Sequence, residues 1–223
     1  MITQPSHFKE RLFNFTVLNI VGLGYYIINM MLKTNAPYTS LNMPWEANIP
    51  FVSWIIFPYL SYFLVAVLIF LLPYKREKLA IYMFRFLFVA FITFTIFIVF
   101  PFQNAFTRPI EEYNGVMWVL FELLKEDLPY NQMPSFHISF SLLYTVIIID
   151  FFEHKLIKSS IILWFILICC SVLMMLQHHF ADIISAIILV LLTIYISNIP
   201  SIKERILKIY ISIYHAWISL ISN

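Results

Sequence analysis

Six apolar stretches, each about long enough to cross a lipid bilayer, constrain this chain more than any other feature. A membrane-spanning helix needs about 20 apolar residues, and inside lipid only a helix or a closed barrel satisfies every backbone hydrogen bond. The first stretch lacks a following small-residue cleavage site, so we expect it to be retained. We predict an all-α integral membrane protein with six transmembrane helices, at Phe13–Leu32, Phe51–Leu72, Leu79–Phe102, Phe136–Phe152, Ser160–Leu176 and Ile183–Ile199.

The composition excludes several classes of protein. Hydrophobic residues make up 61% of the 223 residues and charged residues 12%, whereas charged residues are about 25% of a typical soluble domain. This balance excludes a soluble globular domain and a disordered chain, and a net charge of +2 gives no basic surface for nucleic acid. Without an internal repeat or a change in composition, residues 1–223 are expected to form a single membrane-embedded domain.

The loops predict an orientation. Basic residues collect on the cytoplasmic side of membrane proteins, and here ten fall in loops on one side and three on the other. Both termini lie on the ten-residue side, so we expect both in the cytoplasm. The short polar connections favour a bacterial inner membrane, with the opposite face towards the periplasm. The ten are Lys9, Arg11, Lys75, Arg76, Lys78, Lys155, Lys158, Lys203, Arg205 and Lys208; the three are Lys33, Arg108 and Lys125.

Three further segments complete the layout. The apolar run Val116–Leu124 is too short to span, and we predict a short helix on the outer membrane surface between the third and fourth spans. The tail Ile206–Asn223 mixes apolar, aromatic and basic residues, which favours an interfacial helix over a seventh span. The first outer loop, Lys33–Pro50, shows no pattern that indicates a site.

Four polar residues near the outer face are the functional candidates, because ionisable residues near spans are often functional. His137 opens the fourth span and His178 lies 41 residues later, which is close to two crossings of about 20 residues each. Both histidines are therefore expected at the same depth on the same side. Arg108 lies on that side because no span separates it from His137. His178 and Asp182 are four apart, so on a helix they would share one face and could hydrogen-bond.

This set of side chains fits phosphoryl transfer without a metal. A neutral imidazole can attack phosphorus, and a carboxylate on its other nitrogen fixes the tautomer and stabilises the cation that forms. A second histidine can protonate the leaving oxygen and later activate water. An arginine can hold phosphate oxygens by two parallel bonds. The helix start at Ser135 and Phe136 offers backbone N–H groups to an anion.

Each residue also has an alternative interpretation. A histidine at a membrane boundary can be an interfacial side chain, the His178–Asp182 pair can be a structural hydrogen bond, and Arg108 can contact a lipid headgroup. Two histidines and an aspartate can also bind Zn²⁺, with His179 as the further ligand. The combination on one face favours catalysis, and we expect neither metal nor cofactor.

The motifs resemble those of the type-2 phosphatidic acid phosphatase superfamily, whose pattern is K-x6-R-P, P-S-x-H and S-R-x5-H-x3-D. Thr107-Arg108-Pro109 ends the first part, Pro134-Ser135-Phe136-His137 matches the second, and His178-His179-Phe180-Ala181-Asp182 matches H-x3-D. The resemblance covers roughly residues 100–200. It implies that His178 forms a phosphohistidine, Asp182 orients it, His137 protonates the leaving group and Arg108 holds the phosphate.

Two family cations are replaced. Pro101 stands at the position of the family lysine, and Val172, after Ser171, at that of the third-motif arginine. In the loss of these two cations the sequence resembles the branch of inositol-phosphoceramide and sphingomyelin synthases. Neutral donors could replace these cations; the candidates are Gln103, Asn104, Gln177 and His179. The reduced charge suits a phosphodiester or monoanionic headgroup better than a dianionic monoester.

Three functions follow from the sequence, with a lipid phosphate as the partner in the first two. The first is a lipid phosphatase in which water attacks the phosphohistidine at the outer face. The second is a lipid phosphotransferase in which an alcohol replaces water. The third is a non-catalytic lipid-binding membrane protein. We predict His178, His137 and Asp182 as catalytic residues and Arg108, Ser135 and Asn104 as substrate-binding residues.

Overall fold

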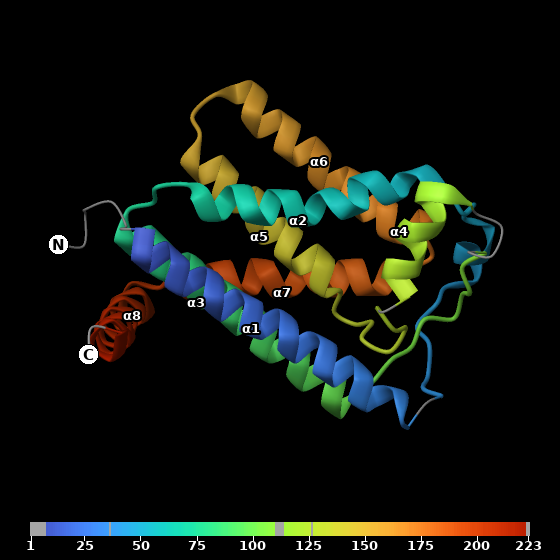
Figure 1. The fold of residues 1–223 in the computed structure, drawn as a ribbon, viewed down its shortest axis with the longest axis horizontal. Helices are drawn as coiled ribbons and strands as arrows, with labels where there is room; N and C mark the ends of the chain where they lie inside the picture. The colour runs from blue at the N-terminus through green and yellow to red at the C-terminus, as the bar shows by residue number, and fades with distance from the viewer. Residues whose placement is uncertain (1–7, 36, 110–113, 126, 222–223) are drawn as a thin grey trace.

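The computed structural model describes residues 8–35, 37–109, 114–125 and 127–221. Within these residues every regular secondary-structure element is a helix (Figure 1). Two short 3₁₀ helices precede the second long helix. The α-helices are α1 (Phe8–Lys33), α2 (Ile56–Leu71), α3 (Arg76–Val99), α4 (Gly115–Lys125), α5 (Phe136–Phe151), α6 (Lys155–Met174), α7 (Phe180–Asn198) and α8 (Pro200–Ile221), and the 3₁₀ helices are η1 (Pro44–Asn48) and η2 (Ser53–Ile55).

Five helices of the described chain have the length and composition to cross a membrane, rather than the six predicted. They are Phe8–Lys33, Ser53–Leu71, Arg76–Val99, Lys155–Met174 and Phe180–Asn198. The predicted fourth span is α5, which has only 16 residues, ten of them buried. A helix surrounded by protein need not match the thickness of the bilayer, which explains why α5 is short.

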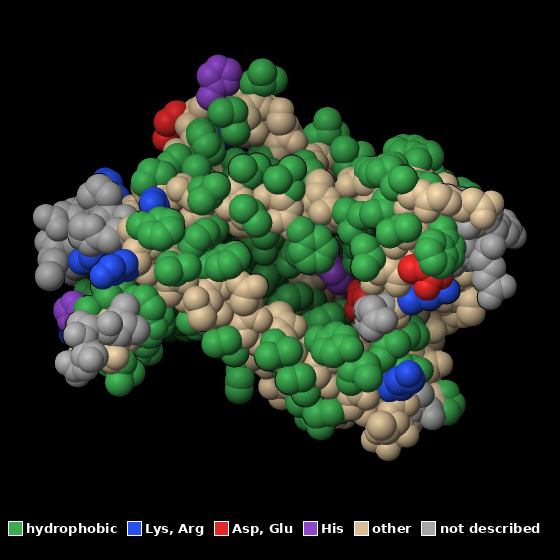
Figure 2. Space-filling model, viewed as in Figure 1, with side chains coloured by type: hydrophobic (Ala, Val, Ile, Leu, Met, Phe, Trp, Pro, Cys, Tyr) green, Lys and Arg blue, Asp and Glu red, His purple; other side chains and the backbone are tan. Residues whose placement is uncertain are grey.

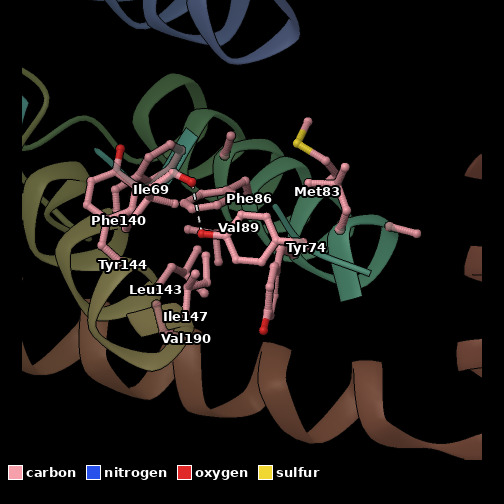
Figure 3. Packing of buried hydrophobic residues seen from close by; sticks show 14 of the residues in the cluster. Ile69, Tyr74, Met83, Phe86, Val89, Phe140, Leu143, Tyr144, Ile147 and Val190 are labelled. Carbon is pink, nitrogen blue, oxygen red and sulfur yellow. Dashed lines mark hydrogen bonds between the residues drawn. The ribbon is translucent and has the colours of Figure 1, made fainter. Parts of the chain in front are cut away.

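Helix α5 is the centre of the bundle. It packs against α2, α3, α6 and α7, which is why its apolar residues face all directions rather than one. Figure 3 shows part of this packing, where Phe140, Leu143 and Tyr144 of α5 meet Phe86 of α3. This central position fixes the direction and depth of the residues at both ends of α5.

Helix α8 leaves the direction of the bundle at Pro200. The residue before a proline is disfavoured in the α conformation, and proline is favoured at the first position of a helix, so α7 ends and α8 begins there. In Figure 1 α8 is seen nearly end-on while the other long helices run across the view. The Asn14 side chain on α1 donates to the Tyr210 hydroxyl at 2.9 Å and thereby holds α8 to α1.

The two short segments predicted to be helical fall in helices. Helix α4 covers Val116–Leu124 and buries Phe121 and Leu124. The predicted tail helix is part of α8, except for residues 222–223, which lie outside the described residues.

Candidate active site

The two histidine motifs meet where α5 and α7 begin. Ser135 caps α5, because its hydroxyl oxygen accepts from the Ile138 N–H at 3.3 Å, as serine commonly does at this position. The Ser135 N–H donates to the Asp182 carbonyl at 3.1 Å. This amide, expected from the sequence to face an anion, instead joins P-S-x-H directly to H-x3-D.

The chain reaches His178 through a tight turn at the end of α6. The Leu176 N–H bonds the Leu173 carbonyl at 3.0 Å, and the Gln177 N–H bonds the Val172 carbonyl at 2.8 Å; together these bonds form a Schellman motif. Leu176 takes the left-handed conformation (φ 51°) that glycine usually adopts there. The turn places His178 before α7 rather than on it.

His178 and Asp182 form a buried pair. The His178 Nδ1 and Asp182 Oδ2 atoms are 3.2 Å apart, and the same oxygen accepts from the His179 N–H at 2.8 Å. His178 is 3% exposed and Asp182 0%. The His178 Nε2 atom is buried and has no hydrogen-bond partner among the described residues. A carboxylate on Nδ1 leaves the lone pair on this free nitrogen.

His137 lies beside His178, with ring centroids 5.9 Å apart. The His137 Nε2 atom is 2.9 Å from the Tyr59 hydroxyl, while Nδ1 is buried without a partner in the described chain. Tyr25, Tyr59 and Tyr62 surround the ring. Figure 2 shows a histidine and an acidic side chain within a hollow on the face of the molecule that it displays.

Arg108 lies close to an acidic residue that the sequence did not indicate. Burial lowers the pKa of the Arg108 guanidinium from its ordinary value, and the nearby Asp127 carboxylate opposes that shift. The Arg108 Nη1 atom is buried and has no partner among the residues described. Asp127 accepts from the Tyr25 hydroxyl and the Gln177 amide, each at 2.7 Å. No pattern in the sequence distinguishes Asp127 from the other acids of its loop.

His179 has a different environment from His178. Its Nδ1 atom is 2.6 Å from Glu46 Oε2, and its Nε2 atom accepts from the Ala105 N–H at 3.1 Å. Glu46 also accepts from the Phe180 N–H at 2.9 Å and is 1% exposed. Because both ring nitrogens bond to protein, His179 holds the loops together. Glu46 comes from the first outer loop, where sequence reasoning found nothing.

Asn104 and Val172, which stands at the position of one replaced cation, both contact other parts of the protein. The Asn104 amide donates to the Leu176 carbonyl at 2.7 Å, and its oxygen accepts from the Phe106 N–H at 2.8 Å. Asn104 therefore links the loop of Arg108 to the turn before His178. Val172 is fully buried in an apolar cluster, so this position supplies packing instead of charge.

An apolar cavity of about 480 Å³ reaches Tyr62 and Phe136, two neighbours of His137. Tyr62, which packs against the His137 ring with centroids 5.6 Å apart, forms part of its wall together with Phe136 of the P-S-x-H motif. Residues of α1, α2, α3 and α5 line the cavity as far as Tyr74 and Tyr82. Its walls suit a hydrocarbon chain.

Comparison with known proteins gives one match. The sequence model of the PAP2 superfamily matches residues 39–196, more than two thirds of the chain. The match contains all three motifs and extends from the loop that holds Glu46 into α7. No curated protein and no solved structure matches the chain.

Proposed function

Since the chain belongs to the PAP2 superfamily, we propose that it is a membrane lipid phosphatase that uses His178 as its nucleophile. One observation carries the proposal: the His178 Nδ1 atom faces Asp182, while its Nε2 atom is buried and has no hydrogen-bond partner in the described part of the chain. Burial of a polar nitrogen without a hydrogen-bond partner is unfavourable. A bond from this nitrogen to the phosphorus of a phosphate ester would account for its burial without a partner.

In the first step the Nε2 lone pair of His178 attacks phosphorus, and the bond from phosphorus to the lipid oxygen breaks. Asp182 stabilises the positive ring that forms. His137, entering the step as its cation, gives the proton on Nδ1 to the leaving oxygen. Tyr59, accepting from the Nε2–H group, would hold that proton in place, so that the proton on Nδ1 is the one transferred. Arg108 would bind the phosphate oxygens, and the N-terminal end of α5 at Phe136 would direct its positive dipole towards them.

In the second step His137, now neutral, takes a proton from water as the water oxygen attacks phosphorus. The nitrogen–phosphorus bond breaks, phosphate leaves and His178 is restored. Ser135 and Asn104 act as positioning residues in this scheme, because each joins one motif to another through hydrogen bonds.

The lipid tail would occupy the apolar cavity beside His137. Its volume of about 480 Å³ lies within the roughly 300–1,000 Å³ typical of ligand sites. We place the six-span layout around it, with α5 as a short central span, both termini in the cytoplasm and the reaction at the periplasmic face of a bacterial inner membrane. In this layout α4 lies on the outer surface of the membrane.

A second candidate function is transfer of the phospho-headgroup to an alcohol. The deep burial of His178 and Asp182 favours it, because a transferase must exclude water from the phosphohistidine. The position of the family's third-motif arginine is also occupied by the buried Val172. The site therefore has less positive charge than the family pattern, with Arg108 next to Asp127, and this suits a monoanionic phosphodiester.

The experiment is incubation of the purified protein with phospholipids and isoprenoid phosphates, beside His178→Ala as the inactive control. Free phosphate is assayed and lipid products are identified by mass spectrometry. Phosphate release that depends on His178 supports the phosphatase, whereas a new lipid without phosphate supports the transferase. Unchanged lipids with measurable binding would refute both and favour a non-catalytic lipid-binding protein.

The tail cavity has its own test. Ala66 lines the cavity, so Ala66→Phe should reduce turnover of long-tailed substrates and leave short-tailed substrates unaffected. Leu64→Phe is the matched control, because Leu64 is an exposed residue of the same helix. Equal loss for both tail lengths would argue against this location of the tail.

A further inference from the structure

A second cavity lies at the opposite end of the bundle from the catalytic residues. It has a volume of about 630 Å³ and is lined by residues of α3, α5, α7 and α8 and by Lys75, which precedes α3. Asp150, in its wall, is 13 residues after His137 on α5, which places it about 20 Å along the helix at 1.5 Å per residue. The reaction proposed above does not use this cavity.

The cavity has more positive than negative charge. Four basic residues line it, together with two acidic residues: Lys75, Lys78, Arg85 and Lys203, with Glu77 and Asp150. Lys78 pairs with Asp150 at 2.9 Å and Lys203 pairs with Glu77 at 2.7 Å. These pairs use both carboxylates. Within the described residues, neither Lys75 nor Arg85 has a carboxylate at ion-pair distance.

Arg85 is an unusual residue for its position. It lies within the long apolar helix α3 and is only 7% exposed. Its Nε atom donates to the Ser197 hydroxyl at 2.8 Å and its Nη2 atom to the Asn198 side-chain oxygen at 3.1 Å. Both hydrogen-bond partners are neutral, and the guanidinium lies 6.0 Å from the centroid of the Tyr82 ring. The Asp150 carboxylate acts on Arg85 only from beyond ion-pair distance and is itself paired with Lys78. Two of the five donors of a guanidinium bond to described residues, and among these residues no partner for the other three is found.

The chemistry of this cavity identifies the class of ligand. A buried cation is costly unless an anion pairs with it, and arginine binds phosphate through parallel hydrogen bonds. The apolar side chains of Ile81, Val146 and Ile194 also line the cavity, and these can contact the start of an acyl chain. We propose that Arg85 and Lys75 bind the phosphate group of an anionic phospholipid at this end of the bundle.

The basic residues of this cavity could instead belong to the general excess of positive charge on the cytoplasmic side. A matched variant distinguishes this explanation from a phosphate-binding site. Lys155, an exposed residue at the start of α6, belongs to the predicted cytoplasmic side but does not line the cavity. Lys75→Gln removes one charge from the cavity and Lys155→Gln removes one charge outside it. Arg85→Gln can still bond Ser197 and Asn198, and Lys75→Gln provides the test if Arg85→Gln does not fold.

The experiment titrates the full-length protein, in neutral detergent, with phosphatidylglycerol, phosphatidylcholine or inorganic phosphate, and follows the midpoint of thermal unfolding. Wild type should be stabilised by phosphatidylglycerol more than by phosphatidylcholine. Lys75→Gln should need about fivefold more phosphatidylglycerol for half of the effect, as expected for one basic residue near a lipid surface. Lys155→Gln should resemble wild type.

The outcomes of these titrations support or overturn the proposal. Stabilisation by inorganic phosphate that Lys75→Gln weakens would support the cavity with a soluble phosphate as its ligand. An equal effect of the two lipids on wild type, or equal weakening by Lys75→Gln and Lys155→Gln, would overturn the proposal. Phosphate that binds at the catalytic residues would stabilise Lys75→Gln and wild type equally, because Lys75 lies at the other end.

Discussion

Asp182→Asn separates the catalytic and structural roles of one carboxylate. In the protein Asp182 Oδ2 faces His178 Nδ1 at 3.2 Å and accepts from the His179 N–H at 2.8 Å. An asparagine with its oxygen at the Oδ2 position can keep both bonds, but it lacks the negative charge that stabilises the positive His178 ring. With its NH₂ group at that position it would donate to His178 Nδ1 and move the ring proton to Nε2, and the His179 N–H would lose its acceptor.

The two effects differ in size. The same aspartate-to-asparagine change lowers turnover about 10⁴-fold in catalytic triads, equivalent to about 5 kcal/mol. The remaining bond from His179 loses its charge assistance, about 1 kcal/mol, which lowers the unfolding midpoint by about 2–4 °C in a chain of this size. Turnover is measured with the substrate that the lipid incubation identifies, and stability by thermal unfolding in detergent.

A control and two outcomes complete this test. Glu153→Gln makes the same chemical change at a carboxylate that is 97% exposed, and it should change neither quantity. If folded Asp182→Asn kept more than a tenth of wild-type turnover, the catalytic role of this carboxylate would be refuted. A large fall in the unfolding midpoint would show that the carboxylate acts mainly as a structural cap.

Three other substitutions test the remaining contacts of the site. Tyr59→Phe removes the hydroxyl on His137 Nε2 and should lower kcat about 10- to 100-fold with little change in KM; an unchanged kcat would contradict this role. Glu46→Gln weakens the bond to His179 Nδ1 and should lower the unfolding midpoint by about 3–10 °C, measured by thermal unfolding. Arg108→Ala should raise KM about 10- to 100-fold with a smaller change in kcat, and a changed kcat at constant KM would assign it to the chemical step instead.

The sequence predicts contacts that depend on local spacing. His178 and Asp182 are in contact, as their separation of four residues indicates, but the reason differs from the predicted one. Helix α7 begins at Phe180, so His178 is not on its face. Asp182 instead reaches back as a cap of the helix and accepts from two successive residues.

Residue roles and helix lengths that depend on three-dimensional packing could not be predicted from the sequence. Glu46 and Asp127 lie in loops without periodicity, and their roles follow from which segments meet at the end of the bundle. The length of α5 is another example, because hydropathy counts Phe136–Phe152 as a span without knowing that protein surrounds it. The proline at the start of α8, by contrast, marks a boundary that local chemistry alone determines.

The hydrogen bond from the Ser135 N–H to the Asp182 carbonyl has a consequence for the dynamics of the site. Pro134 has no amide hydrogen, so in this stretch Ser135 has the first exchangeable amide after Met133. Its deuterium exchange would report whether the starts of α5 and α7 separate, since exchange of a bonded amide requires a local opening. If the two histidines move apart to admit a bulky headgroup, this amide should exchange faster than those in the middle of α5. Slow exchange would instead mean that the lipid enters between histidines held at a fixed separation.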